Sequence, residues 1–367
     1  MVRLIDEFRR PELLIPLLER IRQFDDRNYA FMEVCGTHTV SISRFGIRNA
    51  VPKNIRLLSG PGCPVCVTSQ EDIDRAIELA TLPNVILATF GDMMKVPGTR
   101  SSLAKEKAKG ADIRVCYSTR EALEIAEQNP SKEVIFYGVG FETTAPTVAF
   151  SVLEAKKRNI KNYSVFSVHK LVPPALRALL NSGEVKLDGF ILPGHVSVVI
   201  GLKAYQFLAD EYQMPGVVSG FEPLDILQTI EMLLKQVKSG QARIENQYRR
   251  TVTFEGNVHA QKAMEEVFKV VDADWRGIGT IPESGLTINE KYEEFDASKR
   301  FETKVDYSIE PPNCSCGDVL RGVKLPFDCK LFGKGCTPEH PVGPCMVSSE
   351  GACAAYYRYD RFINAEA

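Results

Sequence analysis

The sequence predicts an α/β protein with two related parallel-sheet domains, followed by a loop-rich, cysteine-rich C-terminal domain. Strand-sized apolar runs alternate with helical patterns from about residue 31 to about residue 240, as in parallel sheets covered by crossover helices. Short motifs recur at offsets of about 130–133 residues, which indicates a duplication. Six of the ten cysteines lie beyond residue 313, in a segment rich in Gly and Pro.

The elements follow from the spacing of the apolar residues. Segment 1–30 is expected to form an amphipathic helix, with apolar residues at helical spacing at Leu13, Leu14, Leu17, Leu18 and Ile21. Continuous apolar runs predict strands over 30–34, 55–58, 85–90, 113–117, 134–139, 164–168, 189–192 and 216–219. Helical periodicity between them predicts helices over 69–80, 119–128, 146–158, 173–181, 202–211 and 223–238.

The repeated motifs predict the domain boundaries. The similar pairs are 31–38 with 163–169, 58–63 with 191–195, and 88–92 with 218–222. They predict two related α/β domains, over 31–140 and 141–240. Beyond residue 240 the alternation fades, and a charged helical segment over 257–268 leads into a third domain over 241–367.

Charge and hydropathy exclude several classes of function. Forty-five basic residues against forty-seven acidic ones leave no positive excess for a nucleic acid or an anionic membrane surface. The longest apolar runs, such as 85–90, are too short to span a bilayer. Segment 1–10 carries charges of both signs and is not expected to be a signal peptide. The protein is therefore expected in the cytoplasm, where clustered cysteines bind metal or do redox chemistry more often than they form structural disulfides.

Cysteines follow two of the predicted strands. Cys35 comes directly after 30–34, while Cys63 and Cys66 come after 55–58 and just before a helix. Ligands of parallel sheets bind beyond the carboxyl ends of the strands. A Cys-x-x-Cys pair at a helix start suits thiol–disulfide chemistry, and it can also chelate a metal with Cys35 as a third thiolate. The alternative is that these thiols only pack a loop.

Other polar side chains near these strand ends are further candidates. His38 lies three residues beyond Cys35, where it could act as a general base or orient a metal ligand; the alternative is a structural histidine. Asp92 follows the strand over 85–90 and could equally cap a turn. Glu142 lies in a Gly-rich loop as a possible polar ligand. Residues expected to be structural are His169, His195, His340 and Cys116.

The C-terminal cysteines are Cys314, Cys316, Cys329, Cys336, Cys345 and Cys353. Their spacing matches neither the paired Cys-x-x-Cys of zinc ribbons nor a ferredoxin run. An iron–sulfur cluster suits scattered thiolates on loops, because it accepts ligands from several directions. The spacing leaves a cluster, zinc and disulfides open.

Together these motifs resemble the HypD family of [NiFe]-hydrogenase maturation proteins. The residues that carry the resemblance are 31–38 (FMEVCGTH), 60–68 (GPGCPVCVT), 90–98 (FGDMMKVPG), 140–146 (GFETTAP), 192–197 (LPGHVS), 329–338 (CKLFGKGCTP) and 343–353 (GPCMVSSEGAC). They lie in the family's order and cover nearly the whole chain.

The resemblance implies a cytoplasmic scaffold for assembly of the Fe(CN)2CO group of the hydrogenase, rather than a turnover enzyme. It implies that Cys35 holds iron, that Cys63 and Cys66 form a redox-active pair, and that the C-terminal domain carries a [4Fe–4S] cluster. Our hypothesis from these residues is that electrons pass from the cluster to the Cys63–Cys66 pair and open its thiolates, so that iron is held by Cys35, Cys63 and Cys66, with His38 and Asp92 behind these ligands. The preferred cluster ligands are Cys314, Cys329, Cys336 and Cys345, with Cys316 and Cys353 as alternates.

The resemblance also implies partners. These are the small chaperone HypC and the cyanide donor HypE, which acts with HypF. A monomer that forms such heterocomplexes is expected, without nucleic acid or membrane. Two other functions remain open from the residues: an iron–sulfur-dependent reductase of partner disulfides, and an interaction protein whose metal is only structural.

Overall fold

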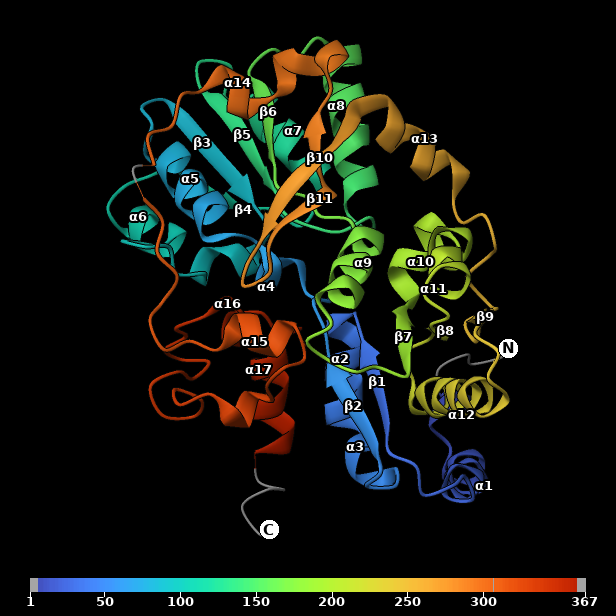
Figure 1. The fold of residues 1–367 in the computed structure, drawn as a ribbon. Helices are drawn as coiled ribbons and strands as arrows, with labels where there is room; N and C mark the ends of the chain where they lie inside the picture. Colours follow the sequence, from blue (N-terminus) through green and yellow to red (C-terminus); the bar gives the residue numbers. More distant parts are fainter. Residues whose placement is uncertain (1–5, 306, 362–367) are drawn as a thin grey trace.

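Two parallel β-sheets form the centre of the protein, as described for residues 6–305 and 307–361 by a computed structural model (Figure 1). The first sheet has five strands in the order β2-β1-β7-β8-β9, and the second has four in the order β4-β3-β5-β6. Neighbouring strands run parallel throughout both sheets. The predicted α/β class is therefore confirmed, together with a cysteine-rich C-terminal region.

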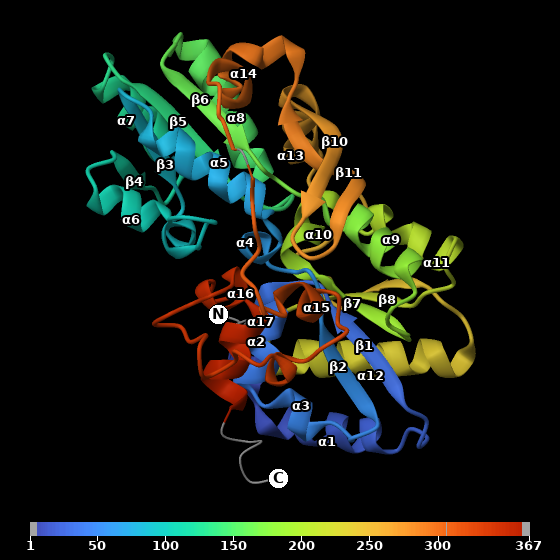
Figure 2. The same cartoon turned by 60° about the vertical axis from the view of Figure 1, so that its left-hand side comes forward.

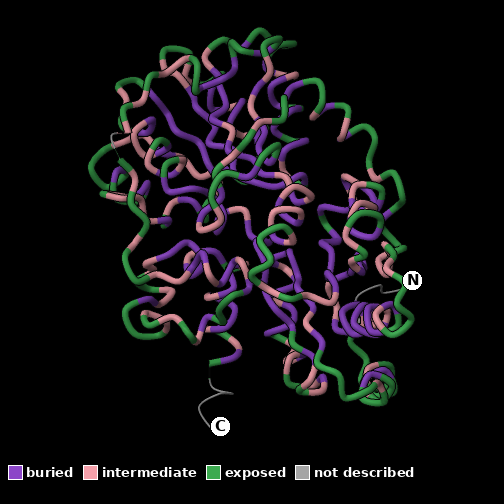
Figure 3. Tube along the Cα trace, in the orientation of Figure 1, coloured by how far each residue is buried: buried purple, intermediate pink, exposed green. Residues whose placement is uncertain are grey.

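All eight strands predicted from apolar runs are present. The first sheet contains β1 (Tyr29–Glu33), β2 (Ile55–Ser59), β7 (Gly189–Pro193), β8 (Gly216–Ser219) and the additional edge strand β9 (Ile244–Asn246). The second contains β3 (Val85–Thr89), β4 (Ile113–Val115), β5 (Glu133–Gly138) and β6 (Tyr163–Ser167). Most of these strands are buried along their length (Figure 3), which is why continuous apolar runs identified them.

Helices connect and cover the strands. The predicted helices correspond to α1 (Pro11–Arg22), α5 (Gln70–Thr81), α7 (Thr119–Gln128), α8 (Ala145–Arg158), α9 (Val172–Ser182), α12 (Pro223–Ser239) and α13 (Val258–Val267). The segment expected as one helix over 202–211 is divided into η3 (Lys203–Tyr205) and α11 (Gln206–Asp210). Helices not predicted are α2 (Gly36–Arg44), α3 (Ile47–Ala50), α4 (Pro64–Val67), η2 (Gly91–Lys95), α6 (Leu103–Ala108) and α10 (Gly194–Ile200). Within the described residues, no helix has the length and apolar character needed to cross a membrane.

The two sheets do not correspond to the two ranges 31–140 and 141–240 that were predicted as separate domains. The first sheet joins β1 and β2 to β7 and β8, whereas the second takes all of its strands from the middle of the chain. The chain leaves the first sheet after β2 and returns to it at β7, so each of the two ranges contributes strands to both sheets. The repeated motifs at β1 and β6 consequently lie in different sheets.

Beyond residue 240 the chain contains, besides the predicted helix α13, regular structure that was not predicted. An antiparallel hairpin, β10 (Phe268–Trp275) and β11 (Gly279–Ile288), extends from the end of the second sheet, with Leu286 donating its backbone N–H to the His169 carbonyl at 3.1 Å. It is followed by η4 (Glu290–Phe295) and α14 (Ala297–Arg300). The cysteine-rich region comes after these and contains only short helical turns: α15 (Cys316–Leu320), η5 (Pro326–Asp328), α16 (Pro344–Val347), α17 (Ala352–Ala355) and the π-helical η6 (Tyr356–Asp360).

The cysteine-rich region packs against the place where the two sheets meet. Figures 1 and 2 both show it beside α2 and α4, which follow β1 and β2 respectively. The two sheets and the cysteine region share one apolar core that includes Cys63, Cys66, Cys316 and Cys345. The fold thus brings the two predicted groups of cysteines together.

Candidate metal and thiol site

Cys35 lies between the end of β1 and the start of α2. Its side chain is only 8% exposed. Burial raises the pKa of the thiol to about 12, and the negative charge of Glu350 acts in the same direction, while the backbone N–H groups of Thr37 and His38 oppose it. At neutral pH the Cys35 thiol therefore keeps its proton until a metal or another electrophile takes the sulfur.

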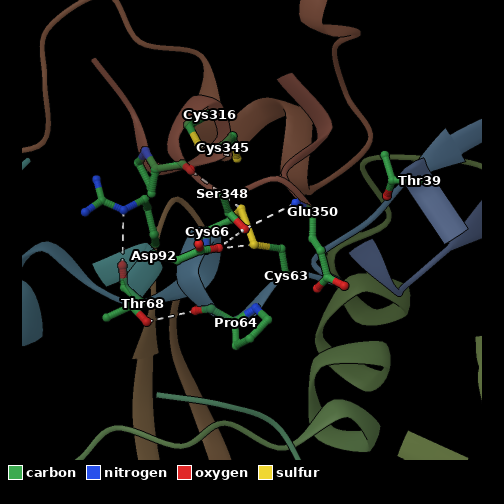
Figure 4. The surroundings of a disulfide bond; sticks show 12 residues. Thr39, Cys63, Pro64, Cys66, Thr68, Asp92, Cys316, Cys345, Ser348 and Glu350 are labelled. Atoms are coloured by element: carbon green, nitrogen blue, oxygen red, sulfur yellow. Dashed lines mark hydrogen bonds between the residues drawn. A yellow bond between two sulfur atoms is a disulfide. The ribbon is translucent and has the colours of Figure 1, made fainter. Parts of the chain in front are cut away.

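Cys63 and Cys66 form a disulfide at the start of the short helix α4 (Figure 4). Cys63 is 3% exposed and Cys66 is fully buried. The Cys63 sulfur accepts the backbone N–H of Cys66 at 3.3 Å. The two-residue spacing therefore places the sulfurs as predicted for thiol–disulfide chemistry, in a position closed to large reactants.

The Cys35 and Cys63 loops lie against each other. The backbone N–H of Gly36 donates to the Gly62 carbonyl at 2.8 Å, and that of Gly60 donates to the Glu33 carbonyl at 2.7 Å. A Cβ atom on Gly62 would lie 2.1 Å from the Cys35 nitrogen, so only glycine permits this approach. The parallel pairing of β1 with β2 is what brings both loops to the same edge of the sheet.

The segment between Cys345 and Cys353 holds the other side of the site (Figure 4). Ser348 donates to Asp92 Oδ2 at 3.0 Å, and Thr37 donates to Glu350 Oε1 at 2.7 Å. Asp92 follows β3 of the second sheet, whereas Thr37 follows β1 of the first. This one segment therefore joins the ends of both sheets next to the disulfide.

All six C-terminal cysteines line one pocket, with walls that also include Leu331, Phe332 and Met346. Within the described ranges, no three His, Cys, Asp or Glu side chains are gathered closely enough to hold a single metal ion. A cluster takes its ligands at separated corners, and six thiols around one pocket are compatible with that requirement. Four thiolates from this pocket would hold a [4Fe–4S] cluster, and the contacts do not single out four of the six.

Cys316 and Cys345 are the pocket cysteines that direct contacts connect to the disulfide. Their sulfurs lie 2.6 Å apart, and Pro344, the neighbour of Cys345, receives a weak hydrogen bond at 3.9 Å from the Cys66 sulfur. Hydrogen bonds from the thiols of Cys314 and Cys345 hold the pKa of Cys316 below its usual range, and the positive charge of Arg276 acts likewise. Cys316, predicted as a spare thiol, is therefore well placed for a role in the pocket.

His38 is placed for a structural role more than for proton transfer. Its Nε2 atom lies 2.9 Å from the Gly220 carbonyl, and its ring stacks on Phe221 at 4.7 Å between ring centroids. Burial lowers the pKa of His38 to about 4, so the ring is neutral near pH 7. His195 stacks on the same Phe221 ring at 4.0 Å. His38 Nδ1 is buried without a hydrogen-bond partner in the described structure.

The remaining candidates lie elsewhere. Cys116 is buried in the core of the second sheet, as expected. His169 is buried with its Nδ1 2.9 Å from Ser167 Oγ, and His340 lies on an exposed turn. Glu142 accepts the backbone N–H of Val172 at 2.9 Å, and burial raises its pKa to about 7.

Three residues of the site were not predicted. Glu33 at the end of β1 accepts the Cys35 backbone N–H at 3.0 Å. It is the one charged residue of an otherwise apolar strand, and the sequence could have identified it by that feature. Glu350 and Arg276 come from distant segments, and no local spacing pointed to them. Burial raises the pKa of Glu33 to about 7, while hydrogen bonds from Thr39 and Cys35 act against this rise.

Replacing Glu350 by glutamine is expected to make Cys35 more acidic. The amide keeps an acceptor for Thr37 but removes the negative charge that helps to raise the Cys35 pKa. Alkylation of Cys35 by iodoacetamide, followed by peptide mass spectrometry, should accelerate about tenfold at a given pH below the thiol pKa, as for a shift of one pH unit. Thr37→Val removes the hydrogen bond alone and should leave the pH profile in place. An unchanged profile in Glu350→Gln would contradict the electrostatic role of Glu350.

The chain is similar to known proteins over nearly its whole length. The family model described as "HypD: Hydrogenase formation hypA family" matches residues 12–360. The chain is 49% identical over 367 residues to "Hydrogenase maturation factor HypD2" of Bradyrhizobium diazoefficiens, covering 97% of each chain. It is 48% identical over 370 residues to "Hydrogenase maturation factor HypD" of Cupriavidus necator, covering 98% of this chain and 97% of that protein. It is 45% identical over 366 residues to the Escherichia coli K12 protein with the same description, covering 98% of each.

Proposed function

This chain belongs to the HypD family of hydrogenase maturation factors, and from that premise we propose that it assembles the Fe(CN)2CO group on its own thiolates. The observation that carries the proposal is the meeting of three thiol groups at one place. The Cys35 loop, the Cys63–Cys66 disulfide and the C-terminal cysteines are linked by direct contacts. Thiolates suit iron that carries cyanide and CO, because such iron is soft.

The disulfide controls how many thiolates the site can offer. While the Cys63–Cys66 bond is intact, neither sulfur can bind iron as a thiolate. Reduction breaks the S–S bond and adds two electrons and two protons, which gives two thiols. Iron binding then displaces the protons from the sulfurs that it takes, including the high-pKa thiol of Cys35. Opening of the disulfide is thus the step that readies the site.

The C-terminal pocket supports the proposal as the place from which electrons reach the disulfide. A [4Fe–4S] cluster held by four of its thiolates would supply single electrons there, drawn from a low-potential one-electron donor. The pocket cysteine Cys345 is adjacent to Pro344, whose carbonyl contacts Cys66. Electron transfer from the pocket to the Cys63–Cys66 pair requires a short path of this kind.

We further propose the partners and location that go with this chemistry. The small chaperone HypC would share the iron, and HypE, supplied by HypF, would deliver cyanide. The proposal places the protein in the cytoplasm, where the open thiols stay reduced. His38 and Asp92 would act behind the iron ligands, since Asp92 holds Ser348 and His38 lies next to the Cys35 loop.

Reduction of partner disulfides is less compatible with the site. Cys63 is 3% exposed and Cys66 is fully buried, so a disulfide of another protein has no access to their sulfurs. A small iron complex needs far less room than a folded partner. The buried pair therefore favours assembly on the protein itself.

Infrared spectroscopy tests the proposal directly. The protein would be purified without oxygen from cells that also make HypC and HypE, and spectra would be recorded with and without the chaperone. We expect stretching bands of iron-bound CO and cyanide on the protein, and Mössbauer signals of a [4Fe–4S] cluster. A colourless protein that contains only zinc would overturn both the cluster and the assembly role.

A further inference from the structure

An apolar groove lies between α9, α10, α13 and the β10–β11 hairpin, where the chain passes from the second sheet to the first (Figure 1). Its volume is about 470 Å³, which is within the range of small-molecule sites in proteins. The apolar side chains of its walls include Leu171, Pro173, Ile200, Met264, Phe268 and Leu286. The groove shares no lining residue with the cysteine pocket, so the thiol site does not account for it.

Glu142 is the one buried carboxyl group among the described residues that line this groove. It is 2% exposed. Its Oε1 atom accepts the backbone N–H of Val172, the first residue of α9, at 2.9 Å. Its Oε2 atom is buried and has no hydrogen-bond partner among the described residues. Capping of α9 therefore accounts for only one of the two carboxyl oxygens.

An unpaired buried oxygen indicates a missing partner. Buried polar atoms of native proteins nearly always have a hydrogen-bond partner, which can belong to a ligand. Burial raises the pKa of Glu142 to about 7, while the Val172 N–H acts against this rise. A positive group that approaches Oε2 would stabilise the ionised carboxyl, because a buried charge is costly unless it is paired.

The other polar groups of the groove do not supply this partner. Gln261 already donates its side-chain amide to the Val199 and Glu255 carbonyls, both at 2.7 Å. Glu265 lies at the exposed rim and is also acidic. The described lining contains no lysine, arginine or histidine. An apolar body with one positive group is therefore the ligand that complements the groove.

The surface around the groove favours a small molecule over a folded partner. Val270, which is 51% exposed, is the only lining residue among the large apolar side chains that the described structure exposes. A protein interface requires a broader apolar area than this one side chain provides. We propose that the groove binds a small organic amine, whose apolar body lies between α9, α13 and the hairpin and whose ammonium group donates to Glu142 Oε2.

The experiment is isothermal titration calorimetry on the full-length protein, purified without oxygen. The probes are tryptamine and tryptophol, which differ in that a hydroxyl group replaces the ammonium group. We expect tryptamine to bind with a Kd of about 1 mM or lower, as is usual for a ligand of its size. Tryptophol should bind about tenfold more weakly, because its hydrogen bond to Glu142 carries no charge.

Glu142→Gln removes the charge and keeps an acceptor for Val172. We expect it to weaken tryptamine about tenfold and to leave tryptophol within about threefold of the parent protein. Glu265→Gln is the matched control, since it removes a carboxyl group at the exposed rim of the same groove. It should change tryptamine binding by less than about threefold, because exposed charge pairs contribute little.

Ala204→Trp provides a second test that does not depend on folding of the Glu142 variant. Ala204 lines the groove and is only partly buried, so a larger side chain there should fill the groove and abolish binding of both probes. Absence of tryptamine binding to the parent protein would overturn the inference. Equal affinities for the two probes, unchanged in Glu142→Gln, would also overturn it, as would tryptamine binding that Ala204→Trp leaves intact. If Ala204→Trp instead weakens binding of HypC or HypE while tryptamine does not bind, the groove is a protein-docking surface and the inference is wrong.

Discussion

Replacing Cys63 by alanine is expected to abolish loading of the iron–cyanide group while the C-terminal cluster persists. The variant cannot form the Cys63–Cys66 bond and lacks one of the thiolates that the open pair provides. The six pocket cysteines are all retained, so their spectrum should not change. Infrared bands of bound CO and cyanide should disappear, whereas the Mössbauer signals of the cluster should remain. The expected loss is complete rather than gradual, because alanine offers no replacement ligand.

Two further measurements make this result specific. Cys116→Ala removes a buried cysteine in the core of the second sheet and should load iron as the parent protein does. The free energy of unfolding of Cys63→Ala should fall by only about 2 kcal/mol, because the disulfide closes a very short loop. Loss of the loading bands in a folded variant is then a chemical effect. Persistence of the bands would mean that assembly takes place elsewhere in the protein.

The sequence predicted the buried strands well and the hairpin not at all. Strands such as β3 and β5 are apolar on both faces, so their runs stand out without any knowledge of the fold. Strand β10 is exposed or half-exposed between its buried ends Phe268 and Trp275, and β11, in which buried and exposed residues are mixed, contains Glu283 at a positive φ of 53°. Its polar segments therefore looked like loops.

The order of the strands in the sheets could not be predicted from the sequence, for a different reason. Each apolar run identifies a strand but not its neighbour, and the repeated motifs favoured two consecutive domains. The pairing of β1 with β7 links positions far apart in the chain, such as Phe31 and Gly189. Such pairing depends on packing of the whole protein, which local periodicity does not report.

The sequence predicted the cysteines of the site but not the charged residues around them. Cysteines after parallel strands can be placed at one sheet edge from topology alone, which located Cys35 and the Cys63–Cys66 pair. Glu350 and Arg276 reach the same place through long-range contacts of loops, so their positions depended on the fold. The two charges act at different thiols: Glu350 adds to the effect of burial in raising the pKa of Cys35, while Arg276 lies beside the loop that carries Cys66.

The close contact between the Cys35 and Cys63 loops leads to the second large prediction. Gly62→Ala is expected to reduce the free energy of unfolding by about 3 kcal/mol, since the added methyl group meets backbone that cannot move aside easily. The Cβ would lie 2.1 Å from the Cys35 nitrogen and 2.3 Å from the Val34 carbonyl carbon. Urea denaturation under anaerobic conditions measures this change. Any folded fraction should also lose iron loading, because the loop that bears Cys63 must move away from Cys35.

Gly91→Ala separates the effect of contact from that of losing a glycine. Gly91 begins η2, and a Cβ there would meet only the Val115 Cγ1 atom, at an ordinary 3.6 Å. Its unfolding free energy should therefore change by less than about 1 kcal/mol. Gly62 does not have a positive φ, so the difference between the two variants reflects the approach of the loops rather than backbone strain. If Gly62→Ala unfolds like the parent protein and still loads iron, assembly does not require Cys35 and Cys63 to be held together by this contact.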